Sequence, residues 1–251
     1  VDNKPGVSGT VGTRIAAKAK NDGYTLLLGQ TGEITVNRLL IKDMGYDPMK
    51  ELVPVVLIGN APLVMLAPAD APYNTVAEFI QQARVKQGEF SYGSVGAGTP
   101  GHLAAVALTL GAKLNMVHVP YKGVGPLMSD LMAGRLHVFF SSASAAMPQI
   151  KGGKLKALAV TTPQRMTSMP QTPTVAESGL PGFSYTLWGG LFVPAGTPTT
   201  VIDSLNKEVN NILASPDIKS RLDADNVSVP RNTPAEFSEY VKAEASKFEK
   251  L

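Results

Sequence analysis

The sequence predicts an α/β protein, and three observations support this fold class. Short apolar runs of strand length alternate with helix-forming runs along the chain. Two of these strands are followed by a Gly-bearing segment and then by a helix. Capping boxes at Thr75–Glu78, Thr174–Glu177 and Thr233–Glu236 mark further helix starts. The strands are numerous enough for two sheets, which we expect to be mostly parallel.

Composition excludes several classes of protein. The chain has 251 residues, 44% hydrophobic and 17% charged, which is typical of a globular protein with one large or two small domains. The net charge of +3 is spread without long basic runs and gives no argument for nucleic acid as a partner. No apolar stretch approaches the length that spans a bilayer. The absence of cysteine excludes disulfides, thiol nucleophiles and Cys-ligated metals.

The first third of the chain contains a strand followed by a polar, Gly-bearing loop. A short Gly-flanked helix comes first, and it is not a phosphate loop because no G-K-[ST] follows its glycines. The residue types then predict a strand at Tyr24–Gly29, a loop at Gln30–Glu33 and a helix at Ile34–Leu40. Strands at 52–59 and 63–67 follow, parted by Asn60-Ala-Pro62, and Pro68–Pro72 is expected to cross between domains.

The segment Phe90–Ala105 carries the clearest functional pattern. An apolar run ends in glycines, and a helix-forming run begins at Pro100, which suits the first helical position. Thr99 is expected to be its N-cap, accepting from an early helix N–H. Gly96 and Gly98 permit a tight turn and leave the amides unshielded. Unpaired N–H donors at a helix N-terminus suit an anion, so we interpret the turn as half of a carboxylate-binding site.

Two alternatives compete for this turn. Gly96-Ala-Gly-Thr-Pro-Gly101 also matches the dinucleotide fingerprint G-x-G-x-x-G, which needs an acidic residue about 20 residues further on. The segment Met116–Gly123 contains no carboxylate. Pro100, which has no backbone N–H to donate, lies where a pyrophosphate would be held. The other alternative is a tight turn that binds nothing.

The remaining elements continue the alternation. Gly123-Val-Gly-Pro126 is expected to lead into a helix to Arg135, and a short helix is expected to end at Ile150. Two further helices are expected, one from a Thr197-Pro198 start to about Ala214 and one that begins at Ser215-Pro216. The last helix, after Thr233, carries an apolar stripe of Phe237, Tyr240, Val241, Phe248 and Leu251. The further strands are expected at 116–121, 137–142, 156–162 and 185–194.

Catalytic and metal chemistry find little support. The histidines His102, His118 and His137 lack metal-ligand spacing, and we expect His102 to be a hydrogen-bonded structural residue. No G-x-S-x-G elbow supports Ser94 as a nucleophile. We therefore expect no enzyme activity, no metal and no cofactor.

Several long motifs resemble one family. They are YGSVGAGTPGHLA, VPYKGVGPLMSDLMAGRLHVFF, MPQIKGGKLKALAVTTPQR, PTVAESGLPGF and LWGGLFVPAGTP, with VDNKPGVSGTVG and DGYTLLLG upstream. Together they resemble the substrate-binding proteins of tripartite tricarboxylate transporters, the Bug receptors, from end to end of the chain. The resemblance implies a two-lobe periplasmic binding protein-like (type II) fold, with residues 1–67 plus 189–251 as lobe one and 68–188 as lobe two.

The same resemblance implies a function and a set of site residues. It implies a periplasmic, monomeric receptor that closes on a small organic carboxylate and delivers it to membrane permease subunits. A ligand sensor for a signalling partner and a nucleotide-dependent α/β enzyme remain the alternatives. Carried over, the ligand-binding residues are Gln30, Thr31 and Gly32 in lobe one and Ser94, Gly96, Gly98 and Thr99 in lobe two, with Tyr121 and Ser141 along the second wall.

The chain departs from the family pattern in two places. An N-terminal strand–loop–helix segment that normally precedes the VDN-type turn is absent from this sequence, and we expect it to be missing or processed away. Ser141 stands where the family often has Asp. Without that anion, repulsion of a ligand carboxylate falls and an acceptor for a ligand amine is lost. We therefore expect an anionic ligand without an amino group.

Overall fold

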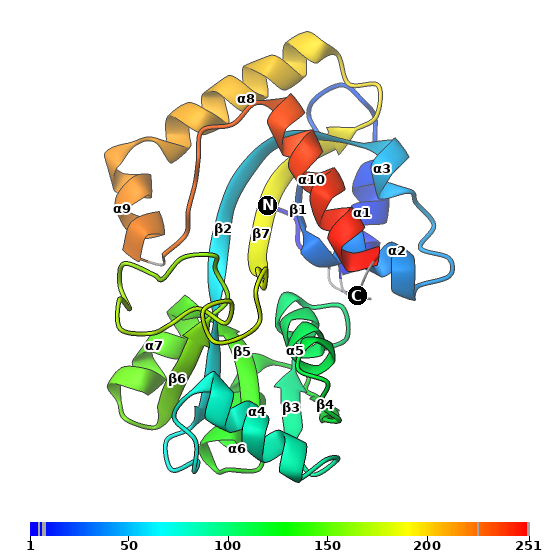
Figure 1. The fold of residues 1–251 in the computed structure, drawn as a ribbon. Coiled ribbons are helices and arrows are strands. Elements are labelled where there is room, and N and C mark those ends of the chain that lie inside the picture. Colours follow the sequence, from blue (N-terminus) through cyan, green and yellow to red (C-terminus); the bar gives the residue numbers. More distant parts are fainter. Residues whose placement is uncertain (5, 7–8, 225, 250–251) are drawn as a thin grey trace. The chain divides into compact units, whose positions relative to one another are not determined.

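The structure is a computed structural model that describes residues 1–4, 6, 9–224 and 226–249. By its internal contacts the chain divides into two compact units. Unit 1 consists of Val1–Asn60 and Trp188–Leu251, and unit 2 consists of Ala61–Leu187. Each unit combines strands with helices packed on them (Figure 1), so the predicted α/β class is confirmed.

The strands of the described residues form one hydrogen-bonded path. They are β1 (Leu27–Gln30), β2 (Leu52–Pro68), β3 (Ser91–Ser94), β4 (Val117–Pro120), β5 (Val138–Ser142), β6 (Leu155–Val160) and β7 (Thr186–Pro194). Their order is β1-β7-β2-β5-β3-β4, with β6 beside β2. Only the β3–β4 and β3–β5 pairs are parallel among the pairings described, whereas β1–β7, β2–β5 and β2–β6 are antiparallel. The prediction of two mostly parallel sheets was therefore wrong, because β2 belongs to both units and takes antiparallel partners.

Strand β2 replaces the two strands predicted at 52–59 and 63–67. Pro62 does not break it, because proline loses only an N–H donor and its fixed φ is compatible with extended backbone. Asn60 forms a bridge with Ser228 in unit 1 through two backbone hydrogen bonds of 2.9 Å. The segment between Pro68 and Pro72 lies within unit 2, and the chain passes from one unit to the other between Asn60 and Ala61.

The helices follow the predicted order, with some differences at their starts. They are α1 (Thr10–Ala17), the π-helix η2 (Gly32–Val36), α2 (Asn37–Leu40), α3 (Pro48–Glu51), α4 (Val76–Val85), α5 (Pro100–Gly111), α6 (Val124–Met132), α7 (Ala143–Lys151), α8 (Thr199–Leu213), α9 (Pro216–Ala224) and α10 (Pro234–Glu249). Thr75 and Thr233 each accept a hydrogen bond from the backbone N–H three residues on, as a capping box requires.

Two predicted helix starts were wrong. Thr174 and Glu177 exchange both capping-box hydrogen bonds, at 2.8 and 3.0 Å, yet the segment continues as a turn. The capping box provides acceptors for the backbone N–H groups of Thr174 and Glu177, but whether a helix follows depends on tertiary packing. At the start of α8, Pro198 occupies the N-cap position, and the Thr197 hydroxyl donates to the Pro194 carbonyl instead of capping the helix.

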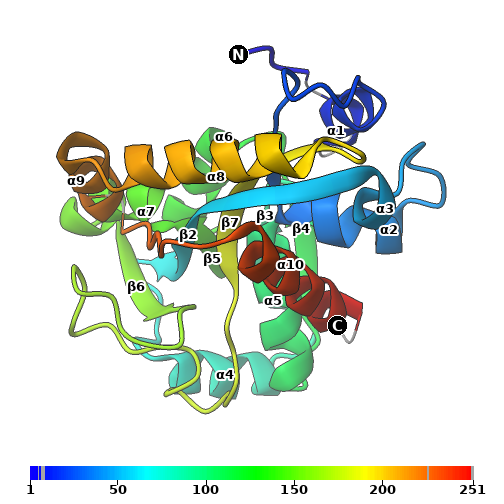
Figure 2. The same ribbon diagram turned by 90° about the horizontal axis from the view of Figure 1, so that it is seen from above.

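The core of unit 1 surrounds Trp188, which is fully buried. Phe237 and Tyr240 of α10 meet its ring edge-on, with centroids 6.1 and 5.8 Å away. The predicted stripe on α10 is confirmed at Phe237, Val241 and Phe248, which are buried, whereas Leu251 lies outside the described residues. Helix α8 packs through Ile202 on β2 and β7, so the two helices lie on different sides of these strands (Figure 2).

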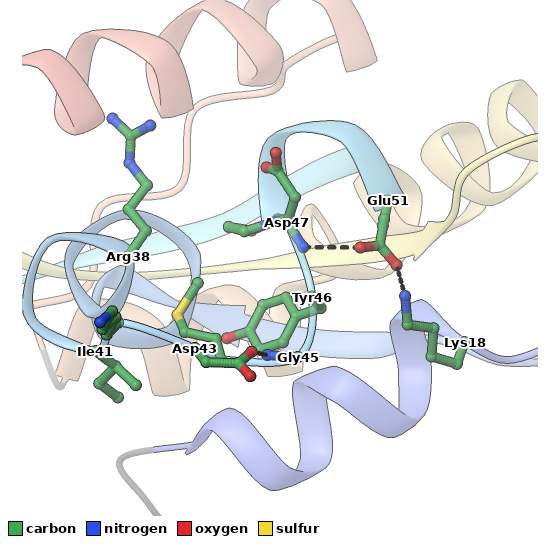
Figure 3. Close-up of a pocket in the computed structure, with 11 residues that line it drawn as sticks. Lys18, Arg38, Ile41, Asp43, Gly45, Tyr46, Asp47 and Glu51 are labelled. Carbon is green, nitrogen blue, oxygen red and sulfur yellow. Dashed lines mark hydrogen bonds and ion pairs between the residues drawn. The ribbon is translucent and has the colours of Figure 1, made fainter.

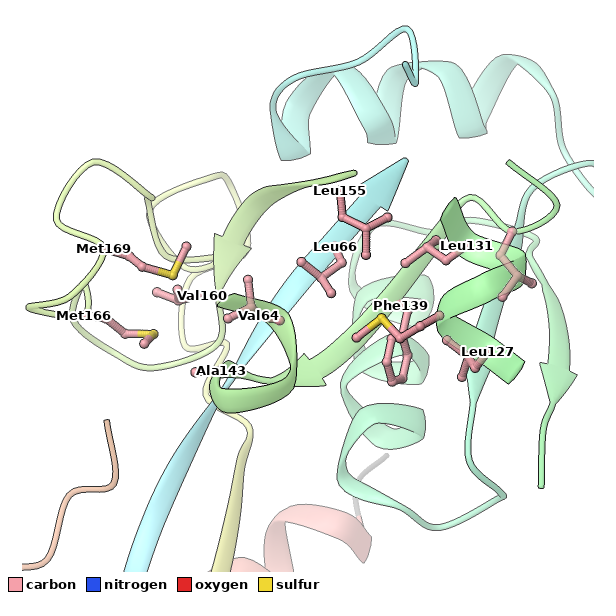
Figure 4. Close-up of a cluster of buried hydrophobic side chains, with 13 residues drawn as sticks. Val64, Leu66, Leu127, Leu131, Phe139, Ala143, Leu155, Val160, Met166 and Met169 are labelled. Atoms are coloured by element: carbon pink, nitrogen blue, oxygen red, sulfur yellow. The ribbon is translucent and has the colours of Figure 1, made fainter. Parts of the chain in front are cut away.

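The core of unit 2 is built where α6 and α7 pack on β2, β5 and β6. Leu127, Leu131, Phe139 and Leu66 are among its buried side chains (Figure 4). Strands β3 and β4 run parallel and are connected through α5, which forms a βαβ unit. This unit brings the Gly-rich turn to the carboxyl end of β3, where ligands bind in α/β folds.

Candidate ligand-binding site

The Gly-rich turn of unit 2 joins Ser94, the last residue of β3, to Pro100, the first residue of α5. Gly96 and Gly98 have φ values of +128° and +79°, which residues with a side chain rarely adopt. Thr99 occupies the predicted N-cap position but makes no capping hydrogen bond. Its hydroxyl donates back to the Gly96 carbonyl at 2.7 Å, so its predicted capping role was wrong and it closes the turn instead.

The turn presents several backbone donors. Within the described part of the chain, no group accepts from the backbone N–H of Ala97, Gly98, Gly101 or His102. The first N–H groups of a helix have no partner inside it, and the helix dipole adds a partial positive charge at the same end. An anion can satisfy these donors, so the chemistry of the turn suits a carboxylate.

The other residues predicted for unit 2 lie at the same sheet edge. Since β3, β4 and β5 run parallel, their carboxyl ends meet there, and these ends carry Ser94, Tyr121 and Ser141. The backbone N–H of Tyr121 donates to the Ser94 carbonyl at 2.8 Å. The Tyr121 hydroxyl is already engaged, because it donates to Asp130 at 2.7 Å. The Ser141 side chain is only 2% exposed.

The residues predicted for lobe one lie together in unit 1, but not on a loop. Gln30 ends β1, Thr31 is the N-cap of η2 and Gly32 is its first residue, so the polar loop expected there was wrong. The Gln30 N–H donates to the Glu33 carboxylate at 2.8 Å, while burial raises the pKa of Glu33. Thr31 is fully buried, and its hydroxyl has no hydrogen-bond partner among the described residues. The predicted loop is instead the start of η2, where the Glu33 carboxylate accepts from the Gln30 N–H. The residue types alone did not indicate this arrangement.

Sequence reasoning missed the role of the histidines beside the turn. His118 on β4 places its Nε2 2.6 Å from the Ser94 Oγ, which also accepts from the Gly96 N–H at 3.1 Å. The rings of Tyr92 and His118 stack with centroids 5.0 Å apart, and His102 meets His118 edge-on at 4.5 Å. The alternation of side chains places Tyr92 and Ser94 on one face of β3, but the sequence does not give the register of β3 with β4 that brings His118 within reach of Ser94.

His102 is not the hydrogen-bonded structural residue that the sequence suggested. Its Nδ1 is buried and has no hydrogen-bond partner among the described residues. Burial, with a smaller contribution from His118, lowers the pKa of His102 to about 4, and burial also lowers the pKa of His118. Burial therefore favours the neutral form of both imidazoles.

A pocket of about 530 Å³ lies elsewhere, within unit 1 (Figure 3). Its charged residues are Lys18, Arg38, Lys42, Asp43, Asp47 and Glu51. None of the predicted ligand-binding residues lines it. Lys18 pairs with Glu51 and Arg38 with Glu249, so much of its charge is already neutralised.

The dinucleotide alternative meets only part of its requirements. The βαβ unit and the close helix–strand contact at Gly101 are present. The carboxyl end of β4, where the ribose-binding acid belongs, is followed by Tyr121 and Lys122. Within the described ranges there is no group of three His, Cys, Asp or Glu residues that could hold a metal, and no helix has the length and hydropathy to cross a bilayer.

An α/β fold of two units with unpartnered backbone N–H groups at a strand end is compatible with the class of solute-binding proteins. Comparison with known families agrees: residues 1–251 match the model described as Tripartite tricarboxylate transporter family receptor, TctC. The chain belongs to this family. It is 34% identical to R. palustris Rpa4515 with adipate, with a TM-score of 0.90 over 99% of this chain and 83% of that one.

Two further solved structures are similar over almost the full length of the chain. The periplasmic binding protein BugD is 32% identical, with a TM-score of 0.86 over 100% of this chain and 84% of that one. MatC (Rpa3494) from Rhodopseudomonas palustris with bound malate is 30% identical, with a TM-score of 0.86 over 98% and 84% of the two chains. The members of this family are periplasmic solute-binding receptors, not enzymes. The predicted family and the two-lobe binding-protein fold are confirmed.

Proposed function

We propose that this receptor binds a small organic carboxylate at the turn between Ser94 and Pro100. The observation that carries the proposal is the set of backbone N–H groups at Ala97, Gly98, Gly101 and His102, for which the described residues provide no acceptor. Two related structures contain dicarboxylates, adipate and malate, which makes a dicarboxylate the first ligand class to test. A charged ligand gains about 1.5–3 kcal/mol from each such hydrogen bond, so a few of them support micromolar binding.

The remaining predicted residues receive roles within the same proposal. Gly96 and Gly98 let the ligand approach the backbone, and Ser94, Thr99 and Ser141 contribute hydroxyls in unit 2. Tyr121 contributes the edge of its ring, since its hydroxyl is bound to Asp130. In unit 1, Gln30, Thr31 and Gly32 add further contacts, and the unpartnered Thr31 hydroxyl supports this assignment.

Membership of the family supports a cellular role in transport. We infer that the protein works in the periplasm as a monomer and delivers its ligand to the permease subunits of a tripartite tricarboxylate transporter. A sensor that reports the ligand to a signalling partner is the alternative. Co-purification with a permease subunit supports delivery, whereas co-purification with a histidine kinase supports sensing.

A thermal-shift screen of the purified protein tests the ligand class. The panel contains mono-, di- and tricarboxylates, aromatic acids, acidic amino acids and NAD. A ligand at 100 times its dissociation constant stabilises the fold by about 2.7 kcal/mol, which raises the melting temperature measurably. A shift with a carboxylate supports the proposal. A shift with NAD alone contradicts it and favours the nucleotide-dependent alternative.

A further inference from the structure

The Ser94 hydroxyl lies between two groups that limit how it can bind a ligand. Its oxygen accepts from the Gly96 N–H at 3.1 Å and lies 2.6 Å from the His118 Nε2. Ser94 is 1% exposed, so water cannot readily take the place of either partner. A hydroxyl has one hydrogen to donate and two lone pairs to accept with. The direction of the bond to His118 therefore decides what remains for a ligand.

The two neutral tautomers of His118 have opposite consequences. If Nε2 is bare, Ser94 donates its only hydrogen to His118 and presents a lone pair, which repels a carboxylate oxygen. If Nε2 carries the hydrogen, His118 donates to Ser94, both lone pairs are used and the hydroxyl hydrogen is available to the ligand. Only this second arrangement lets Ser94 bind a carboxylate.

We propose that His118 is a positioning residue, which binds Ser94 through Nε2–H and so directs the Ser94 hydroxyl hydrogen to the ligand carboxylate. The inference rests on the proposed carboxylate site. The ligand favours the Nε2–H tautomer, because a hydrogen bond from Ser94 to a carboxylate is charge-assisted and strengthens the donor chain behind it. The Tyr92 ring stacked on His118 holds the imidazole in place, with the two ring planes 16° apart.

The chain offers a matched control at the other end of β3. His137, which directly precedes β5, contacts Ser91 much as His118 contacts Ser94, with its Nδ1 3.0 Å from the Ser91 nitrogen and 3.1 Å from the Ser91 hydroxyl. The Phe90 ring stacks on His137 with centroids 4.2 Å apart. Ser91 is the first residue of β3 and lies away from the turn. Replacing either histidine by Phe keeps an aromatic ring and removes the hydrogen bond.

The test measures the dissociation constants of malate and adipate by calorimetry for the wild type, His118→Phe, His118→Gln and His137→Phe. We expect His118→Phe to weaken binding at least tenfold, His118→Gln to recover much of that loss through its side-chain NH₂, and His137→Phe to leave affinity unchanged. Thermal unfolding of each ligand-free variant shows whether it is folded.

Nitrogen-15 NMR of the His118 ring provides a readout that a purely structural role does not move. Saturation with the dicarboxylate should leave Nε2 protonated and Nδ1 bare, without protonating both nitrogens. Wild-type affinity in a folded His118→Phe variant, or a bare Nε2 in the bound state, would overturn the inference while leaving the proposed function intact. If the wild type binds neither malate nor adipate nor any other carboxylate of the panel, the carboxylate site itself is refuted and the inference falls with it.

Discussion

The carbonyl oxygen of Phe140 lies 2.5 Å from the point that a Cβ atom on Gly101 would occupy. Helix α5 therefore begins in direct contact with the backbone of β5, and only glycine permits this approach. The contact fixes the helix N-terminus at the edge of the sheet where Ser94 and Ser141 lie. The third glycine of the G-x-G-x-x-G pattern thus has a packing role that does not depend on a nucleotide.

A Gly101→Ala substitution should destabilise the protein by about 1–3 kcal/mol, because the added methyl group forces α5 away from β5. Gly125 is the matched control, since it is also the second residue of a helix and has no atom within 4 Å of its Cβ position. Gly125→Ala should be neutral or stabilising by about 1 kcal/mol. Chemical denaturation measures both changes, and equal stability of the two variants would contradict the close contact.

Much of the α/β pattern was predictable because it depends on local signals. The strand, the Gly-rich turn and the start of α5 at Pro100 appear in the structure as the residue types indicated. The length of β2 was not predictable, because Pro62 usually marks a break and only the pairing of β2 on both sides of it shows that the strand continues. Local propensity also missed the turn after Thr174, where tertiary packing decides.

In the candidate site, as in the fold, the local features were predictable and the long-range contacts were not. Gly96 and Gly98 are predicted to permit a tight turn, and both have positive φ values in the structure. The contact between Ser94 and His118 was beyond sequence reasoning, because these residues are 24 positions apart and meet only through the register of β3 with β4. Whether each predicted residue binds the ligand remains a prediction that mutagenesis can decide.

A methyl group at Gly96 should reduce ligand affinity without a matching loss of fold. The Cβ position of Gly96 has no atom within 4 Å, so Gly96→Ala fills space that the proposed ligand needs. Its φ of +128° adds backbone strain, which a control must reproduce. Gly179→Ala has a positive φ of +107° and the same open surroundings, outside the turn.

We expect both alanine variants to lose about 1–2 kcal/mol of stability from the left-handed conformation. Only Gly96→Ala should weaken the binding of malate or adipate, by at least tenfold, as measured by calorimetry. Equal affinities in the two variants would remove the turn from the site.

The half-buried His102 should make stability depend on pH. Its pKa is about 4 in the folded protein, below the usual value of 6.5, so the unfolded chain binds more protons between these two values. The free energy of unfolding should therefore be greatest above pH 6.5 and fall as the pH drops from 6.5 to 4. The slope from this group stays below about 1.4 kcal/mol per pH unit, the limit for one proton.

Denaturation at several pH values measures this slope, and His102→Gln should flatten it. The neighbouring His118 has a pKa lowered by burial and contributes in the same direction, so some slope remains in the variant. An unchanged slope would assign the acid sensitivity to other groups.

Ser141→Asp should weaken the binding of dicarboxylates. Ser141 is buried at the carboxyl end of β5, the sheet edge that also carries Ser94, so a carboxylate at position 141 would repel an anionic ligand where water screens poorly. We expect at least a tenfold loss of affinity for malate or adipate at pH 7, where the new carboxyl group and the ligand are both ionised. Ser141→Asn is the matched control, because Asn has nearly the same shape as Asp without the charge and should retain more affinity.

Calorimetry with malate, adipate and aspartate measures whether position 141 contacts the ligand and whether the ligand carries an amino group. If Ser141→Asp binds malate as tightly as Ser141→Asn does, position 141 is not near the ligand; if the wild type binds only the amino acid, the expectation of an anion without an amino group is wrong.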